Sequence, residues 1–250
     1  QPIPANYAAW WMCLLPVAAM KQAGLPMPFF IKMDDVEYAL QIKEQVVMMT
    51  GVCVWHENFH LKYAPWNEYY ITRNGCITYA LHGQAKNALA VTLELWRTLL
   101  HLLFLHRYDT AKFVLQGYRD FLRGWNWLQK TDAITLHRQI LQQQQAATEQ
   151  FQTDCTEVPN SIPQVSFFEA TRAAVQKQKS VFLFHPFTKK GFYASRKKGT
   201  AFQLLLKMGG ISLRMLATYR SVVQGFQKNR TVLCEDAAWN RRNQHNSKKK

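Results

Sequence analysis

The chain has 250 residues, 48% of them hydrophobic and 13% aromatic, and its five cysteines show no CxxC spacing. The net charge of +15 is uneven, because residues 172–250 hold eighteen Lys and Arg against two Asp and Glu. These values exclude an intrinsically disordered chain and argue against a disulfide framework or a structural zinc site, which favours a reducing compartment.

The first 82 residues predict a mixed α/β region. Hydrophobic runs alternate there with one helical repeat and with Gly/Pro turns. In chain order the predicted elements are a strand or buried turn leading into a short helix (8–20), a turn (24–28), a helix (34–45), a β-rich stretch split at Gly51 (46–56) and a helix opened by Pro65 (65–82).

The rest of the chain predicts a helical domain over 83–153, a linker over 154–164, and a basic, mainly helical region with a disordered tail over 165–250. Apolar residues recur at helical spacing through the second region. The predicted elements are three antiparallel helices (84–108, 110–129, 131–151), a helix (166–178), a strand (181–187) and a basic, then amphipathic segment (188–210).

No membrane span or leader is predicted. The most apolar window, 93–106, contains Arg97 and His101 and is shorter than the roughly 20 apolar residues that a span needs. The first basic residue is Lys21, so the positive region that opens a signal peptide is not seen. Because the chain starts with Gln, we expect a fragment or a processed product.

Three acids stand at the start of the helix predicted for 34–45. One interpretation is a capping box, with Asp34 as N-cap and Glu37 at position N3, where acids also favour the positive end of the helix dipole. The other is chemical, because a carboxylate at a helix start that faces a cleft can act as a general base on a hydroxyl.

Other chemistry-bearing residues flank this cluster. Trp10 and Trp11 could form a platform for sugar rings or belong to the core, and His56 could bind a metal or lie at the core edge. His60 is interpreted as a bystander. Four residues of the next helix favour a structural role over a catalytic one, although the third could steer phosphate: Tyr69, Tyr70, Arg73 and Asn74.

The motifs WW, GLPMPFFIKMDDVEYAL, TGVCVWHENF and EYYITRN, in this order over residues 7–80, resemble those of family 2 glycosyltransferases of the GT-A type. The resemblance is to bacterial galactofuranosyltransferases of lipid-linked and cell-wall glycan synthesis. Residues 84–150 fit the helical domain of that family less specifically. The implied fold is α/β plus α: the C-terminal half of a GT-A domain, followed by a mostly helical domain.

The resemblance implies an acceptor site around the acidic cluster. Asp35 corresponds to the base that deprotonates the acceptor hydroxyl. Five further residues would bind or line the acceptor site, two of them by positioning its hydroxyls: Asp34 and Glu37, together with Trp10, Trp11 and Phe59.

The resemblance also implies a UDP-sugar donor, a glycan or lipid-linked acceptor, and an inverting displacement. His56 corresponds to a ligand of the Mn²⁺ or Mg²⁺ ion that holds the donor diphosphate. The metal-binding DxD motif occurs nowhere in the chain, and only about ten residues precede Trp10. We therefore expect the nucleotide-binding half to be missing, an upstream polypeptide or a homo-oligomer to be a possible partner, and the isolated chain to lack activity.

A cut GT-A sheet would also leave residues 1–60 with an open edge and exposed apolar surface, and therefore prone to associate. The basic residues 172–250 would hold the protein at the anionic inner face of a bacterial membrane, on the cytoplasmic side. A solvated tail remains an alternative, and nucleic acid is disfavoured because the aromatic cluster is charge-neutral. The alternative function is a catalytically incompetent fragment or a basic, helical protein that binds membrane or nucleic acid.

Overall fold

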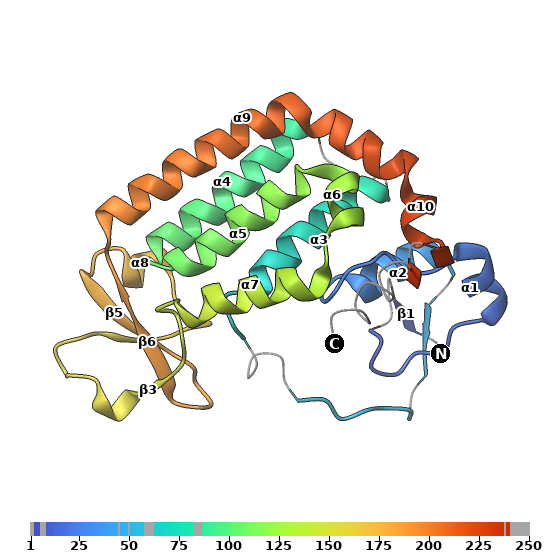
Figure 1. The fold of residues 1–250 in the computed structure, drawn as a ribbon. Helices are drawn as coiled ribbons and strands as arrows, with labels where there is room; N and C mark the ends of the chain where they lie inside the picture. Colours follow the sequence, from blue (N-terminus) through green and yellow to red (C-terminus); the bar gives the residue numbers. More distant parts are fainter. Residues whose placement is uncertain are drawn as a thin grey trace.

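The computed structural model describes residues 3–5, 9–44, 46–49, 51–57, 63–82, 87–237 and 239–240. A bundle of helices forms the middle of the molecule (Figure 1). A small sheet lies at one end of the bundle, and the N-terminal region lies at the other. The candidate residues of the sequence motifs belong to the N-terminal region and to the first helix of the bundle.

The bundle confirms the helical prediction for residues 65–82 and for most of 84–150. Its helices are α3 (Asn67–Leu81), α4 (Ala88–Phe104), α5 (Tyr108–Phe121), α6 (Gly124–Lys130), α7 (Ala133–Gln145) and α9 (Lys198–Lys228). The helix predicted over 110–129 is two helices, because α5 ends at Phe121 and the chain turns before α6 at Gly124, which has a φ of 78°. Helices α3 and α5 approach closely at Gly117, where a Cβ would lie 2.8 Å from the Tyr69 carbonyl oxygen.

The sheet has four strands in the order β3-β6-β5-β4. Its pairs are antiparallel except β4 with β5, which is parallel. The strands are β3 (Thr153–Asp154), β4 (Gln164–Ser166), β5 (Ser180–Phe184) and β6 (Lys190–Ser195). The strand predicted over 181–187 is therefore confirmed as β5. The basic stretch that follows forms β6, because its alternating side chains bury Phe192 and Ala194 against the sheet core.

Two predictions for the segment before β5 differ from the structure. The linker predicted over 154–164 contains a 3-10 turn at Cys155–Glu157 and leads directly into β4. The helix predicted over 166–178 is reduced to α8 (Arg172–Val175). The reason is a contact between residues distant in the sequence. Phe167 is buried in the sheet core and its N–H donates to the carbonyl of Phe184. Helical propensity alone does not reveal this contact.

A buried polar network joins the sheet to the bundle. The Glu149 carboxylate accepts the N–H groups of Asp109, at 2.6 Å, and Thr110, at 3.2 Å, and so caps α5. The guanidinium of Arg107 lies 3.8 Å from the Glu149 carboxylate and 4.4 Å from the ring centre of Phe167. The network fixes the start of α5 and the sheet core in one arrangement.

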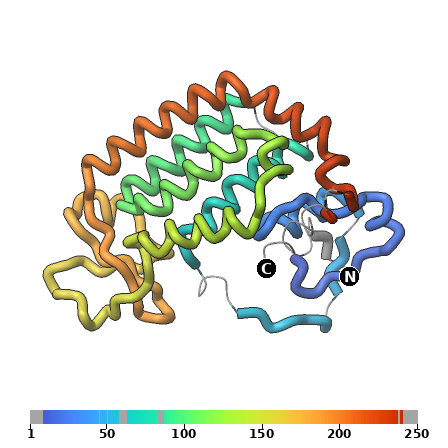
Figure 2. The backbone as a smooth tube through the Cα atoms, in the orientation of Figure 1, coloured from blue at the N-terminus to red at the C-terminus, as the bar shows by residue number. Residues whose placement is uncertain are grey.

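Helix α9 is much longer than the amphipathic stretch predicted within 188–210. It runs from the sheet along the bundle to the N-terminal region, and α10 (Arg230–Cys234) follows it (Figure 2). There the N–H of Leu25 donates to the Cys234 carbonyl at 3.2 Å, and the indole of Trp239 donates to the Pro26 carbonyl at 3.2 Å. None of the described helices combines the length and apolar character needed to cross a bilayer.

The N-terminal region contains α1 (Val17–Ala23), α2 (Asp34–Ile42) and an antiparallel pair, β1 (Ile3–Ala5) with β2 (Val46–Met48). It is attached to the bundle through Met27 and Phe29, which are buried in the bundle core. Its outer surface is apolar. Many large hydrophobic side chains are exposed there, among them Trp11, Met12, Leu14, Val17, Phe30, Val47, Met48, Met49, Val52, Val54 and Trp55.

Candidate functional site

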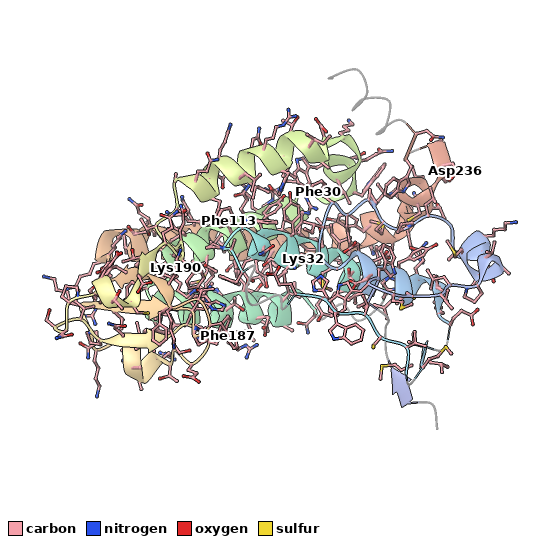
Figure 3. The ribbon with its side chains drawn as sticks, turned by 90° about the horizontal axis from the view of Figure 1, so that it is seen from below. Phe30, Lys32, Phe113, Phe187, Lys190 and Asp236 are labelled. Atoms are coloured by element: carbon pink, nitrogen blue, oxygen red, sulfur yellow. The ribbon has the colours of Figure 1, made fainter. Side chains whose placement is uncertain are left out.

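The start of α2 is built by a strained turn. Lys32 and Met33 both have positive φ values, 66° and 65°, which non-glycine residues rarely adopt and which cluster at functional sites. The side-chain amide of Asn74, on α3, donates at 2.9 Å to the carbonyls of both Ile31 and Lys32. Asn74 therefore holds the turn that presents the acidic pair, and Figure 3 shows Lys32 near the middle of the molecule.

The capping box predicted for this helix is wrong. Met33, not Asp34, is the N-cap residue, and it makes no side-chain cap hydrogen bond. Asp34 is the first helical residue, and the N–H of Glu37 donates to the Met33 carbonyl in the ordinary helical pattern. Because Met33 takes the left-handed conformation, the helix begins one residue earlier than the capping box requires. Asp34 therefore lies inside the helix and is not its N-cap residue.

Asp35 lies half-buried at this helix start. Its Oδ1 accepts the N–H of Val36 at 2.8 Å. Burial raises the pKa of the Asp35 carboxyl above its ordinary value and the charge of Asp34 adds to the rise, while the Val36 N–H and the charge of Lys32 oppose it. A carboxylate with a raised pKa is a stronger base, which suits proton abstraction from a hydroxyl.

Glu37 is placed differently from its two acidic neighbours. It is fully buried, and its Oε1 lies 2.9 Å from Nε2 of His82 at the end of α3. Among the described residues its Oε2 has no hydrogen-bond partner, and neither has Oε1 of Gln41, one turn further along α2. In this structure Glu37 faces the bundle and joins α2 to α3.

The two tryptophans connect α2 with the segment that carries His56. The Trp10 ring meets the Tyr38 ring of α2 edge-on, with centroids 5.6 Å apart. The Trp11 ring stacks on the imidazole of His56, with centroids 4.6 Å apart and planes 10° from parallel. Both indoles are partly exposed, at 38% and 51%. The structure thus brings Trp10, Trp11 and His56 into one neighbourhood with α2.

The structure places no further candidate metal ligands of the described residues beside His56. Within the part of the chain that the structure describes, no three His, Cys, Asp or Glu side chains gather as a metal site would require. His56 is exposed and stacked on Trp11. Phe59, predicted near the acceptor sugar, and His60 lie outside the described residues.

On α3, Arg73 makes its contacts inside the fold, with Tyr69, Tyr70 and Asn74. Arg73 is 2% exposed, donates from Nε to Asn74 Oδ1 at 2.9 Å, and lies over the rings of Tyr69 and Tyr70. Its burial inside the bundle separates it from any phosphate on the surface, so the phosphate-steering alternative has no support here.

Sequence reasoning did not find Tyr38, Asn74 and His82 as supports of the site. Each acts through a contact with a residue at least 28 positions away. The local signal was weak: Asn74 and His82 lie on one helix with no polar periodicity, and Tyr38 is an ordinary helical aromatic. Phe30, which lies against His137 of α7 with ring centres 4.7 Å apart, was also not foreseen.

Comparison with curated proteins relates the chain to glycosyltransferases. It is 32% identical over 127 residues to galactofuranosyltransferase GlfT2 of Mycolicibacterium smegmatis. It is also 32% identical over 130 residues to galactofuranosyltransferase GlfT2 of Mycobacterium tuberculosis. Each match covers 49% of this chain but only 20% of the relative, so the chain corresponds to a small part of those proteins. No protein-family model matches the chain.

Proposed function

We propose that the chain is the acceptor-side part of an inverting glycosyltransferase, which transfers a hexosyl unit of the galactofuranosyl type from a UDP-sugar to a lipid-linked or cell-surface glycan. The observation that carries the proposal is the 32% identity with two galactofuranosyltransferases. The arrangement of Trp10, Trp11, His56 and the α2 start around one neighbourhood supports it. In this proposal residues 1–82 are half of a GT-A domain.

In the proposed reaction Asp35 is the base. Its carboxylate takes the proton of an acceptor hydroxyl as the hydroxyl oxygen forms a bond to the anomeric carbon of the donor. The bond from that carbon to the diphosphate breaks on the opposite face, so the nucleoside diphosphate leaves and the configuration inverts. Asp34, beside Asp35, would hydrogen-bond acceptor hydroxyls, and the exposed indoles of Trp10 and Trp11 would stack on the sugar rings.

A Mn²⁺ or Mg²⁺ ion would supply positive charge that stabilises the departing diphosphate. His56 is the candidate ligand in this chain, and the described residues bring no second and third ligand beside it. We therefore propose that the other ligands and the nucleotide-binding surface come from another polypeptide segment. The exposed apolar surface of residues 10–55 supports this, since patches of that kind mark interaction sites.

The function is tested by acceptor binding, which needs no donor. We expect the chain to bind a synthetic galactofuranosyl oligosaccharide, and Trp11→Ala to weaken binding about tenfold, equivalent to about 1.4 kcal/mol, through loss of the stacking surface. Isothermal titration calorimetry measures this. Trp55→Ala is the matched control, because Trp55 is 90% exposed in the same region and has no proposed role in acceptor binding. Equal affinities for all three proteins, or no binding, would contradict the proposal.

We further propose that the protein is cytoplasmic and binds the inner membrane surface through α9. This helix carries basic residues and no acidic residue. Large apolar side chains are exposed along it and along the neighbouring α4, where the Trp96 indole donates to Ser212 Oγ at 3.0 Å. They are Phe202, Leu206, Leu213 and Leu216 on α9, and Leu89, Leu93 and Trp96 on α4. Apolar residues beside basic ones are typical of helices that lie in the headgroup region of anionic membranes.

Vesicle co-sedimentation tests the membrane proposal. We expect the chain to bind vesicles that contain phosphatidylglycerol and to bind phosphatidylcholine vesicles much more weakly. Leu213→Asp combined with Leu216→Asp should weaken binding at least tenfold, because two exposed leucines no longer insert. Leu14→Asp, at a residue 93% exposed in the N-terminal region, should change nothing. If the double variant binds like the wild type, α9 is not the membrane surface.

A further inference from the structure

A cavity outside the candidate site opens between α3 and α4. Its volume is about 310 Å³, which is in the range of sites that hold small molecules. Residues of α3 and α4 form most of its lining, and α5 and α9 contribute the rest. Among the described residues the lining includes no Lys, Arg or His, so an anionic ligand would find no positive side chain in it.

Gly75 leaves part of this space open. It lies in the middle of α3, where a glycine makes a helix less stable than an alanine would. No close approach requires a glycine there, because a Cβ built on it meets no described atom within 4 Å beyond its own helix. Gly117 on α5 differs, since a Cβ there would collide with α3. The missing side chain of Gly75 therefore serves no packing contact, and it enlarges the cavity that this residue lines.

The cavity begins near the turn that presents the acidic pair. Asn74, which precedes Gly75 on α3, holds the carbonyl of Lys32 at 2.9 Å. Burial raises the pKa of the carboxyls of Asp35 and Glu68, and the charge of Lys32 opposes the rise in both, so Lys32 lies near both acids. From Glu68 the lining follows α3 as far as Tyr79, a length of about 16 Å.

The lining combines polar groups with apolar surface, which is the combination that a sugar ring needs. Its tyrosine rings offer flat apolar faces to the C–H groups of such a ring. Its hydroxyls and carboxylates can form hydrogen bonds with sugar hydroxyls. The residues that carry these groups include Glu68, Tyr79, Glu94, Thr98, Tyr118 and Tyr219.

Other kinds of ligand fit this lining less well. A purely apolar molecule would take the hydroxyls and carboxylates out of water without giving them partners. A cation would compete with positive side chains that are already present. Lys32 and Arg107 lie near Glu68, and Arg97 forms an ion pair with Glu94 at 2.7 Å. A neutral molecule with many hydroxyls meets neither objection.

We propose that this cavity binds neutral sugar residues of the acceptor glycan, in the stretch of the glycan behind the residue that reacts at Asp35. The inference rests on the proposed function, because the acceptor reaches the cavity from the acidic pair. It adds a substrate preference to that function. Acceptors long enough to enter the cavity should bind more tightly than short ones.

Calorimetric titration of the full chain with a galactofuranosyl disaccharide and with the corresponding hexasaccharide tests the proposal. We expect the hexasaccharide to bind at least tenfold more tightly. Gly75→Leu places a side chain in the cavity. It should remove the preference for the longer glycan and leave the affinity for the disaccharide unchanged.

Two further variants serve as controls. Gly75→Ala should raise the thermal midpoint by about 2–4 °C, because alanine favours the helix and its Cβ meets open space; this shows that the position accepts a side chain. Gly210→Leu makes the same change as the test variant at an exposed helical glycine outside the lining, again with open space around its Cβ. It should keep the full preference for the hexasaccharide.

The outcomes separate this inference from the proposed function. Equal affinities of the wild type for the two glycans, or a preference that persists in a folded Gly75→Leu protein, would overturn the cavity site and leave acceptor binding intact. If the wild type binds neither glycan, the proposed function fails and the cavity site fails with it.

Discussion

Asp35→Asn is expected to lower the rate of sugar transfer by roughly 10²–10⁴, the usual contribution of a general base. The amide has nearly the same shape as the carboxylate but cannot take the acceptor proton. The assay uses the chain together with the nucleotide-binding polypeptide that we propose completes it, with a UDP-galactofuranose donor. The loss should appear in kcat, with little change in the KM for the acceptor, because Asp35 acts on the proton rather than on binding.

The pH dependence gives a second measurement of the same residue. Because burial raises the pKa of Asp35, the acid limb of the rate profile should lie above the ordinary pKa of an aspartate, and activity should fall as pH falls through the raised pKa. The stability of the fold changes with pH in the opposite direction to the activity. A carboxyl whose pKa is raised in the folded state makes the fold less stable above that pKa, so Asp35→Asn should raise the thermal midpoint of the chain at neutral pH.

The matched control for this variant is Asp34→Asn. It changes the adjacent acid, which is not the proposed base, and it should raise the acceptor KM more than it lowers kcat. Equal loss of kcat in both variants would mean that the pair acts only through its charge. A fully active Asp35→Asn protein would remove Asp35 from the mechanism.

Glu37→Ala is expected to destabilise the chain by about 3 kcal/mol, because removing one member of a buried pair leaves the other unpaired. Glu37 is fully buried and its partner is His82, at 2.9 Å, so the change opens a polar cavity between α2 and α3. Urea unfolding monitored by tryptophan fluorescence measures the loss. Glu44→Ala, which removes an exposed acid just beyond the same helix, should cost less than about 0.5 kcal/mol.

A double-mutant cycle separates this role from a direct contact with the acceptor. If Glu37 acts by holding α2 against α3, then Glu37→Ala and His82→Ala should each be costly, and the double variant should cost less than their sum. Glu37→Gln, which can still bond to His82, should recover part of the stability. The family resemblance implies instead that Glu37 binds acceptor hydroxyls. That role would show as weaker acceptor binding in a variant of normal stability.

The elements that the sequence predicts well are those specified by local patterns. The acids in its first turn and the spacing of its apolar residues predict α2, and the long helical periodicity predicts α4 and α7. The sheet was only partly foreseen, since β4 has three residues and forms through parallel pairing with β5. A short strand carries little periodic signal, so only its partner across the fold reveals it.

The candidate site likewise has features that local sequence predicts and features that depend on distant partners. The order of motifs predicts candidate residues, namely Trp10, Trp11, Asp35 and His56, because a motif consists of side chains that are neighbours in the sequence. Their roles stay predictions. Their geometry depends on distant partners. Nothing near Trp11 indicates that its ring stacks on His56, 45 positions later, and nothing near Glu37 indicates that it faces inward to His82. Burial of one acid and partial exposure of its neighbours are decided by how α2 lies on α3.

The contact between α10 and the turn at residues 24–27 affects how the N-terminal region folds during synthesis. The Leu25 N–H, the Pro26 carbonyl and the Met27 sulfur meet partners at Cys234 and Trp239, near the other end of the sequence. A ribosome makes the acidic pair before the helical bundle and these partners after it, so the turn before α2 stays unsupported while the bundle is translated. The apolar outer surface of the N-terminal region is exposed during that interval, when chaperones would bind it most readily.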